Sequence, residues 1–89
     1  CNLKNLEFLN LHGNKLTENA IYKLSKCYMN NLENLDISNN ILKDKGLYYL
    51  SKCDLKKLVY LNLSNIWITS EGIKNLNECK FNNIKILIL

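Results

Sequence analysis

Four cysteines and one histidine are the residues of this 89-residue chain best suited to chemistry. The cysteines stand at positions 1, 27, 53 and 79, so each follows the last by 26 residues. Thiols form disulfides, bind zinc or pack as small apolar groups. A zinc site usually pairs its ligands at short spacing, as in C-x-x-C, and no two cysteines here are close in sequence. We therefore predict no metal site and no cofactor.

The even cysteine spacing also bears on disulfide formation. Equivalent positions on adjacent helices lie roughly 8–10 Å apart, beyond the limit of about 7 Å between bridged Cα atoms. We therefore expect all four thiols to be free and packed against the next repeat, which favours a reducing, cytoplasmic location. The sequon Asn62-Leu63-Ser64 points the other way, but it falls on an expected strand and we interpret it as a coincidence.

His12, the only histidine, is the one candidate for general acid–base catalysis. A histidine base needs a nucleophile within hydrogen-bond reach, and the sequence offers no Ser/His/Asp arrangement, phosphate-cradling glycine loop or metal cluster. The chain also lacks arginine, which excludes an arginine finger of the kind that activates GTPases. We predict an ordinary surface role for His12 and no enzymatic activity.

The 26-residue spacing extends well beyond the cysteines. Eight columns of apolar residues keep one phase without insertion, which is the signature of stacked structural repeats. Three of these columns are Leu6, Leu32, Leu58 and Ile84; Leu9, Leu35, Leu61 and Leu87; and Leu11, Ile37, Leu63 and Leu89. They predict repeat units at about 6–31, 32–57 and 58–83, with the strand of a fourth at 84–89. Because the chain opens on Cys1 rather than Met and ends in an apolar run, we expect it to be an excerpt of a longer solenoid.

Each period combines a strand and a helix. Apolar residues at 6, 9 and 11 end in the alternation of a half-buried strand, whereas those at 21, 24 and 27 are spaced like one face of a helix. Glu18, Asp44 and Ser70 stand just before the helical stretches and are predicted to cap them. Helices of about three turns do not persist alone in water, so packing against neighbouring repeats must hold them.

The segment Leu6-x-x-Leu9-x-Leu11-x-x-Asn14-x-Leu16 and its copy from Leu32 to Leu42 resemble the leucine-rich repeat consensus. The resemblance implies an α/β solenoid, a right-handed horseshoe with a parallel concave sheet and convex helices. The period, with Cys closing each helix, is similar to the cysteine-containing subclass found in substrate receptors of ubiquitin ligases. It resembles less closely the longer repeats of ribonuclease inhibitor and of Ran GTPase-activating proteins.

The third repeat departs from the consensus. In the family, the amides at the positions of Asn14 and Asn40 bond the backbone of neighbouring loops. The third repeat has Ile66 there, with Asn65 one place early. We predict a looser or water-bridged turn at Ile66, or else a shifted register in which Asn65 substitutes.

The outward residues of the strands form the predicted binding face. Phe8 and Tyr60 are the kind of aromatic anchors that interfaces use, because they bury much area at little entropic cost; alternatively they only cover neighbouring backbone. Trp67, just past the third strand, is either a binding hot spot or a shield for the turn at Ile66. The predicted partner-binding residues are Phe8, Asn10, His12, Asn34, Asp36, Ser38, Tyr60, Asn62 and Trp67.

These observations predict a protein–protein interaction module. The alternatives are the substrate-selecting part of a ubiquitin-ligase receptor, a GTPase-regulator-like segment or a purely structural one. Nucleic acid is not expected to bind, because the lysines around the second helix have no aromatic platform between them. No stretch is long and apolar enough to span a bilayer, and we expect neither a membrane nor a small-molecule substrate as partner.

Overall fold

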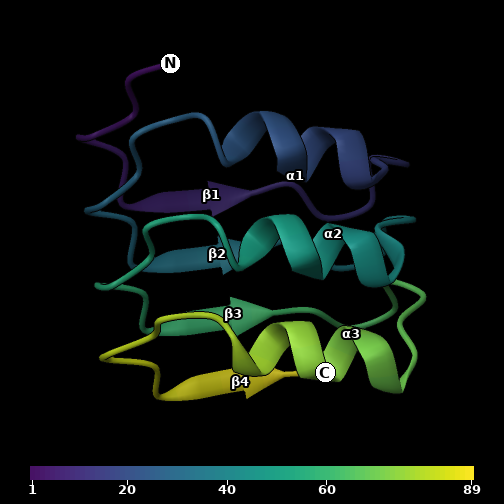
Figure 1. Cartoon of the computed structure of the whole chain (residues 1–89). Helices are drawn as coiled ribbons and strands as arrows, with labels where there is room; N and C mark the ends of the chain where they lie inside the picture. The colour runs from purple at the N-terminus through teal and green to yellow at the C-terminus, as the bar shows by residue number, and fades with distance from the viewer.

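Strands and short helices alternate along the whole chain, and the computed structural model describes all of residues 1–89. The strands are β1 (Phe8–Asn10), β2 (Asn34–Asp36), β3 (Tyr60–Asn62) and β4 (Ile86–Ile88), and the helices are α1 (Glu18–Leu24), α2 (Lys43–Leu50) and α3 (Ser70–Asn77). The strands form one parallel sheet in the order β1-β2-β3-β4. The helices form a second layer beside it (Figure 1). The predicted α/β repeat architecture is confirmed.

The register of the sheet follows the 26-residue period. Leu9 pairs with Leu35, Leu35 with Leu61, and Leu61 with Leu87. Residues one period apart are therefore direct neighbours across the sheet. Because side chains alternate along a strand, this register places all the leucines of the column on the face that meets the helices.

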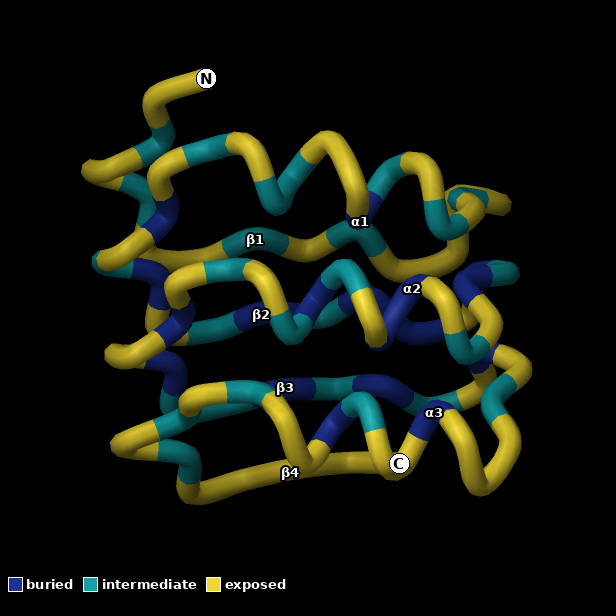
Figure 2. The backbone as a smooth tube through the Cα atoms, in the orientation of Figure 1, coloured by how far each residue is buried: buried dark blue, intermediate teal, exposed yellow.

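The hydrophobic core lies between the two layers and is most complete in the middle of the stack. Leu35 and Leu61 are fully buried, whereas Leu9 is half-buried and Leu87 is 42 % exposed. Figure 2 shows the same gradient, with buried backbone concentrated in the second and third coils and exposed backbone along β4. Each coil is thus covered by the coils on either side, as expected of a solenoid in which repeats contact only their neighbours.

The predicted helix caps are wrong, by one residue in α1 and α3 and by two residues in α2. Glu18, Asp44 and Ser70 lie inside the first turn of their helices, and the N-cap residues are Thr17, Leu42 and Thr69. Of these only Thr69 caps with its side chain, which accepts a hydrogen bond from the Glu71 amide.

Asp44 connects two repeats instead of capping its own helix. Its carboxylate accepts hydrogen bonds from the Thr69 amide (2.7 Å) and the Thr69 hydroxyl (2.6 Å). The hydroxyl bond, followed by the amide bond, lowers the pKa of Asp44 below its ordinary value. The charged form of Asp44 therefore ties the start of α3 to the start of α2.

Asn40 forms the main polar connection between the first two coils. Its side-chain oxygen accepts from the amides of Asn14 (3.0 Å) and Leu16 (2.9 Å) in the preceding coil. Its amide nitrogen donates to the carbonyl oxygens of Leu11, Ile37 and Ser38 at 2.9–3.1 Å. Asn40 is 2 % exposed, so these bonds satisfy backbone groups that water does not reach.

In the third coil Ile66 takes the place of Asn40 and is 1 % exposed. The register does not shift, because Asn65 shares the left-handed backbone conformation of Asn39 and Gly13, and its amide donates to Asn39 Oδ1 instead of to backbone. The alternative in which Asn65 substitutes is therefore wrong. The amides of Asn40 and Leu42, which correspond to those bonded in the coil before, have no protein acceptor. A water-bridged turn at Ile66 stays a prediction.

The prediction of four free thiols is wrong for one pair. Cys1 and Cys27 form a disulfide with their Cα atoms 4.5 Å apart, while Cys53 and Cys79 are free. The estimate of helix spacing does not apply to this pair, because Cys1 and Cys27 each precede a residue of the parallel bridge between Asn2 and Tyr28. The segment after Cys1 instead packs on the chain beyond α1 at strand spacing, with the Tyr28 amide donating to the Cys1 carbonyl and the Leu3 amide to the Tyr28 carbonyl. The expected reducing location was argued from four free thiols, and the disulfide removes that argument.

We expect Asn40→Ala to lower the free energy of unfolding by about 2–4 kcal/mol, because it leaves several buried backbone groups unsatisfied. Asn14→Ala is the matched control from the same column. The Asn14 amide nitrogen makes one long bond, 3.3 Å to the His12 carbonyl, so the loss should stay below about 1 kcal/mol. Urea unfolding followed by circular dichroism measures both. Equal losses in the two variants would contradict the role given to Asn40.

Alkylation of unfolded, unreduced protein should modify two of the four cysteines, because Cys1 and Cys27 are bridged. In the folded protein the two free thiols should react slowly. Burial, followed by the nearby Cys79, raises the pKa of Cys53 to about 12, and burial, followed by Glu78, raises the pKa of Cys79 to about 11. At pH 8 their thiolate fractions are then about a hundredfold or more below that of an ordinary thiol. Intact-mass measurement decides the point, and four rapid modifications would refute the bridge and the burial together.

Candidate functional site

The first outward column of the sheet lies where the alternation predicts it. Phe8, Asn34, Tyr60 and Ile86 are direct partners across the four strands. Phe8 is 70 % exposed and Ile86 50 %, while Asn34 and Tyr60 are partly buried. The sheet therefore presents a row with an aromatic ring on β1, a second on β3 and a polar residue between them.

The second column closes each strand with the same turn. A side-chain oxygen of Asn10, Asp36 and Asn62 accepts at 3.0 Å from the amide two residues further on, that of His12, Ser38 and Ser64 respectively. Asn and Asp side chains stabilise turns in this way. These three predicted binding residues thus have a structural role, because one side-chain oxygen of each already accepts a hydrogen bond from the backbone.

His12, Ser38 and Asp36 form a hydrogen-bonded chain that the sequence did not reveal. The Ser38 hydroxyl donates to Asp36 Oδ1 (2.6 Å) and lies 2.7 Å from His12 Nδ1. Ser38 is 1 % exposed, so the expectation that it faces outwards is wrong. The expectation that His12 has no nucleophile nearby is wrong as well, because the stacking of the first two coils brings Ser38, one period later, against its ring.

This chain does not have the order of a catalytic triad. In a triad the histidine takes the proton of the nucleophile while a carboxylate orients the histidine. Here the serine lies between the other two and donates its hydroxyl hydrogen to Asp36. The donor between Ser38 Oγ and His12 Nδ1 is set by the imidazole tautomer, and Asn39 Nδ2 lies 3.3 Å from the same nitrogen. These contacts orient an exposed imidazole at the edge of the sheet.

The edge beyond the strands is defined by Gly13, Asn39 and Asn65, all with positive φ. Trp67 follows with φ 64° and is 63 % exposed. A left-handed conformation costs a bulky residue about 1 kcal/mol or more, so the surrounding turn must hold Trp67 in place. The result is a large indole presented to solvent beside β3.

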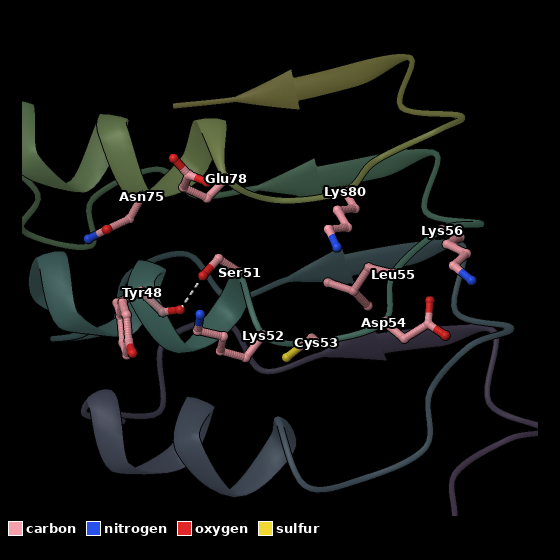
Figure 3. A pocket seen from close by; sticks show the side chains of 10 residues that line it. All are labelled: Tyr48, Ser51, Lys52, Cys53, Asp54, Leu55, Lys56, Asn75, Glu78 and Lys80. Carbon is pink, nitrogen blue, oxygen red and sulfur yellow. Dashed lines mark hydrogen bonds between the residues drawn. The ribbon is translucent and has the colours of Figure 1, made fainter.

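The largest hollow of the molecule lies on the helix side rather than on the sheet. It encloses about 690 Å³ between the carboxy-terminal ends of α2 and α3 and the segments that follow them (Figure 3). Seven of its ten lining residues are polar or charged, so it lacks the predominantly aliphatic and aromatic lining typical of a small-molecule site. The lining residues are Tyr48, Ser51, Lys52, Cys53, Asp54, Leu55, Lys56, Asn75, Glu78 and Lys80. Sequence reasoning missed this hollow, because its residues come from two periods and meet only when the coils stack.

A family model described as Leucine Rich Repeat matches residues 5–27 and 31–55, more than half of the chain. The chain is a leucine-rich repeat protein. The matched residues hold the first two repeats, including Asn14 and Asn40, whereas the third repeat with Ile66 lies outside them. Searches of curated proteins and of solved structures each return no match. None of the three helices of the leucine-rich repeats has the length and apolar character needed to cross a bilayer.

The exposure of Trp67, the only tryptophan, can be measured directly. Because 63 % of the residue is accessible, we expect emission close to that of tryptophan in water and quenching by acrylamide nearly as strong as in the unfolded chain. Steady-state fluorescence before and after denaturation provides the comparison. A blue-shifted emission resistant to quenching would show instead that the indole covers the turn at Ile66.

Proposed function

We propose that the outer face of the sheet recognises a protein partner, with Phe8 and Tyr60 as anchors. The observation that carries the proposal is the row of Phe8, Asn34, Tyr60 and Ile86, held in register and turned away from the core. Leucine-rich repeats are generally protein-interaction modules. Aromatic side chains fixed on a strand give large contact areas at low entropic cost, which is what binding hot spots require.

The dimensions of the face set the expected strength of binding. Strands about 4.8 Å apart place Phe8 and Tyr60, two strands from each other, at a separation of about 10 Å. The whole outer face of four short strands offers only a few hundred Å², against about 800 Å² per partner in a standard interface. The polar edge at His12 and Asn39 and the indole of Trp67 enlarge it. We therefore expect weak binding by this chain, and tighter binding when further repeats extend the sheet.

We propose, more specifically, that the repeats belong to the cysteine-containing subclass and select the substrate of a ubiquitin-ligase receptor. This proposal is supported by the cysteine that follows each helix, at Cys27, Cys53 and Cys79. In that role the sheet face would select the substrate, and the ligase would dock elsewhere.

Alanine at Phe8 or Tyr60 should weaken capture of a partner by about tenfold or more while leaving folding almost unchanged, because loss of a buried anchor costs on the order of 2 kcal/mol. The immobilised chain and its variants are exposed to a cell extract. A retained protein is then purified, and its affinity is measured by calorimetry.

Tyr28→Ala is the matched control. Tyr28 is 73 % exposed, about as much as Phe8, but it lies in the segment between α1 and β2, outside the outward row. Its replacement should leave affinity unchanged. If Tyr28→Ala weakened binding as much as Phe8→Ala, or if neither sheet variant changed it, the sheet face would not be the binding surface.

A further inference from the structure

Three tyrosines gather on the helix layer of the first two coils, outside the sheet face. The ring of Tyr49 meets the ring of Tyr22 at 5.1 Å and that of Tyr48 at 5.5 Å, both edge to face. Tyr22 and Tyr48 are each 44 % exposed. Aromatic contacts of this geometry stabilise the pair beyond the area that they bury, so the cluster forms a firm base on α1 and α2.

A lysine ammonium group lies over each of these rings. The ammonium nitrogens lie 5.2 Å from the ring centroid for Lys26 over Tyr22, 5.8 Å for Lys45 over Tyr49 and 5.0 Å for Lys52 over Tyr48. Such cation–π contacts favour the observed rotamers of otherwise flexible side chains. We call this surface the lysine–tyrosine face and define it by Tyr22, Lys26, Lys45, Tyr48, Tyr49 and Lys52.

The lysines of this face have no carboxylate partner. The only salt bridge in the protein joins Lys74 to Glu71 on α3 at 3.6 Å. The face ends there, because Lys74 and Glu78 replace the residues found one period earlier, Tyr48 and Lys52. Three positive charges therefore lie over a cluster of contacting tyrosine rings, and none of them has a salt-bridge partner.

We propose that the lysine–tyrosine face binds an acidic segment of a partner protein, an extended stretch rich in Asp and Glu side chains. The argument is charge complementarity on a preordered surface. Lysine ammonium groups donate to carboxylates, and tyrosine hydroxyls can donate to the same oxygens. Because the rings already restrict the lysines, binding loses less side-chain entropy than it would with free lysines.

A single-stranded nucleic acid fits the face less well. Its bases would need open ring faces on which to stack. Here each ring has a lysine over one face, and the rings contact one another through their edges. The sequence-based expectation of no aromatic platform between these lysines overlooked Tyr48 and Tyr49, whose rings lie under Lys52 and Lys45.

The neighbouring hollow does not continue the binding path. It shares Tyr48 and Lys52 with the face and is also lined by Lys56 and Lys80, but there Asp54 and Glu78 offset the lysine charges (Figure 3). The carboxy-terminal ends of α2 and α3 lie beside it, and helix carboxy termini carry partial negative charge. An acidic segment is therefore placed along α1 and α2, not in the hollow.

Fluorescence anisotropy with a labelled deca-glutamate peptide tests the proposal on the whole chain. We expect saturable binding that weakens as salt is added, because the attraction is between exposed charges. The triple variant Lys26→Gln, Lys45→Gln and Lys52→Gln should lose affinity by about tenfold or more. Tyr48→Leu keeps the charge but removes a ring, and should weaken binding by about threefold.

The matched control is the triple variant Lys4→Gln, Lys74→Gln and Lys85→Gln, which removes the same charge from exposed sites elsewhere. It should lose less than about threefold, and Phe8→Ala should bind deca-glutamate like the wild type. Circular dichroism confirms that each variant is folded. The proposal is overturned by absence of deca-glutamate binding at low salt, by equal losses in the two triple variants, or by tighter binding of a labelled thymidine decanucleotide.

Discussion

The structure depends on one constraint, that each coil must bury its aliphatic columns against the coils on both sides. A strand of three residues and a helix of seven or eight cannot enclose a core alone. The cost of incomplete stacking is visible in a single column, since Leu35 and Leu61 are fully buried and Leu87 is 42 % exposed. The polar connections act between coils as well. Asn40 bonds backward to the loop of the first coil and Asp44 forward to the start of α3.

The same constraint leaves both outer surfaces free for other uses. Alternation on the strands turns every second side chain away from the core, so the outward row can vary without affecting stacking. The second outward column is less free, because a side-chain oxygen of Asn10, Asp36 and Asn62 closes the turn after each strand. Phe8 and Tyr60 do not close a turn, which makes them the better candidates for contact with a partner.

How much the sequence predicts depends on the range of each interaction. The columns, the parallel register and the outward row follow from periodicity, because one period brings equivalent residues into direct contact. The His12–Ser38 bond joins residues one period apart, so periodicity places the two side chains together, but no sequence pattern indicates that Ser38 is buried. The disulfide escaped prediction because the cysteine column was assigned helix spacing, whereas Cys1 and Cys27 lie beside the Asn2–Tyr28 bridge at strand spacing. The lysine–tyrosine face did leave a local signal, since Tyr22 and Lys26, and Tyr48 and Lys52, stand four residues apart as helix neighbours do.

The third coil differs from the first two at several positions that carry polar or charged function. Ile66 replaces the bonded asparagine, Trp67 stands exposed in a left-handed turn, and Lys74 is paired with Glu71. Its aliphatic columns nevertheless continue in phase, because each coil must bury them against its neighbours. Selection for the fold therefore explains what the coils share, and the residues in which they differ are the ones that binding can have shaped. The third coil adds the exposed indole of Trp67 beside the sheet face, but its helix has no counterpart of the unpaired lysines on α1 and α2. The features that favour binding therefore lie on different coils for the two surfaces.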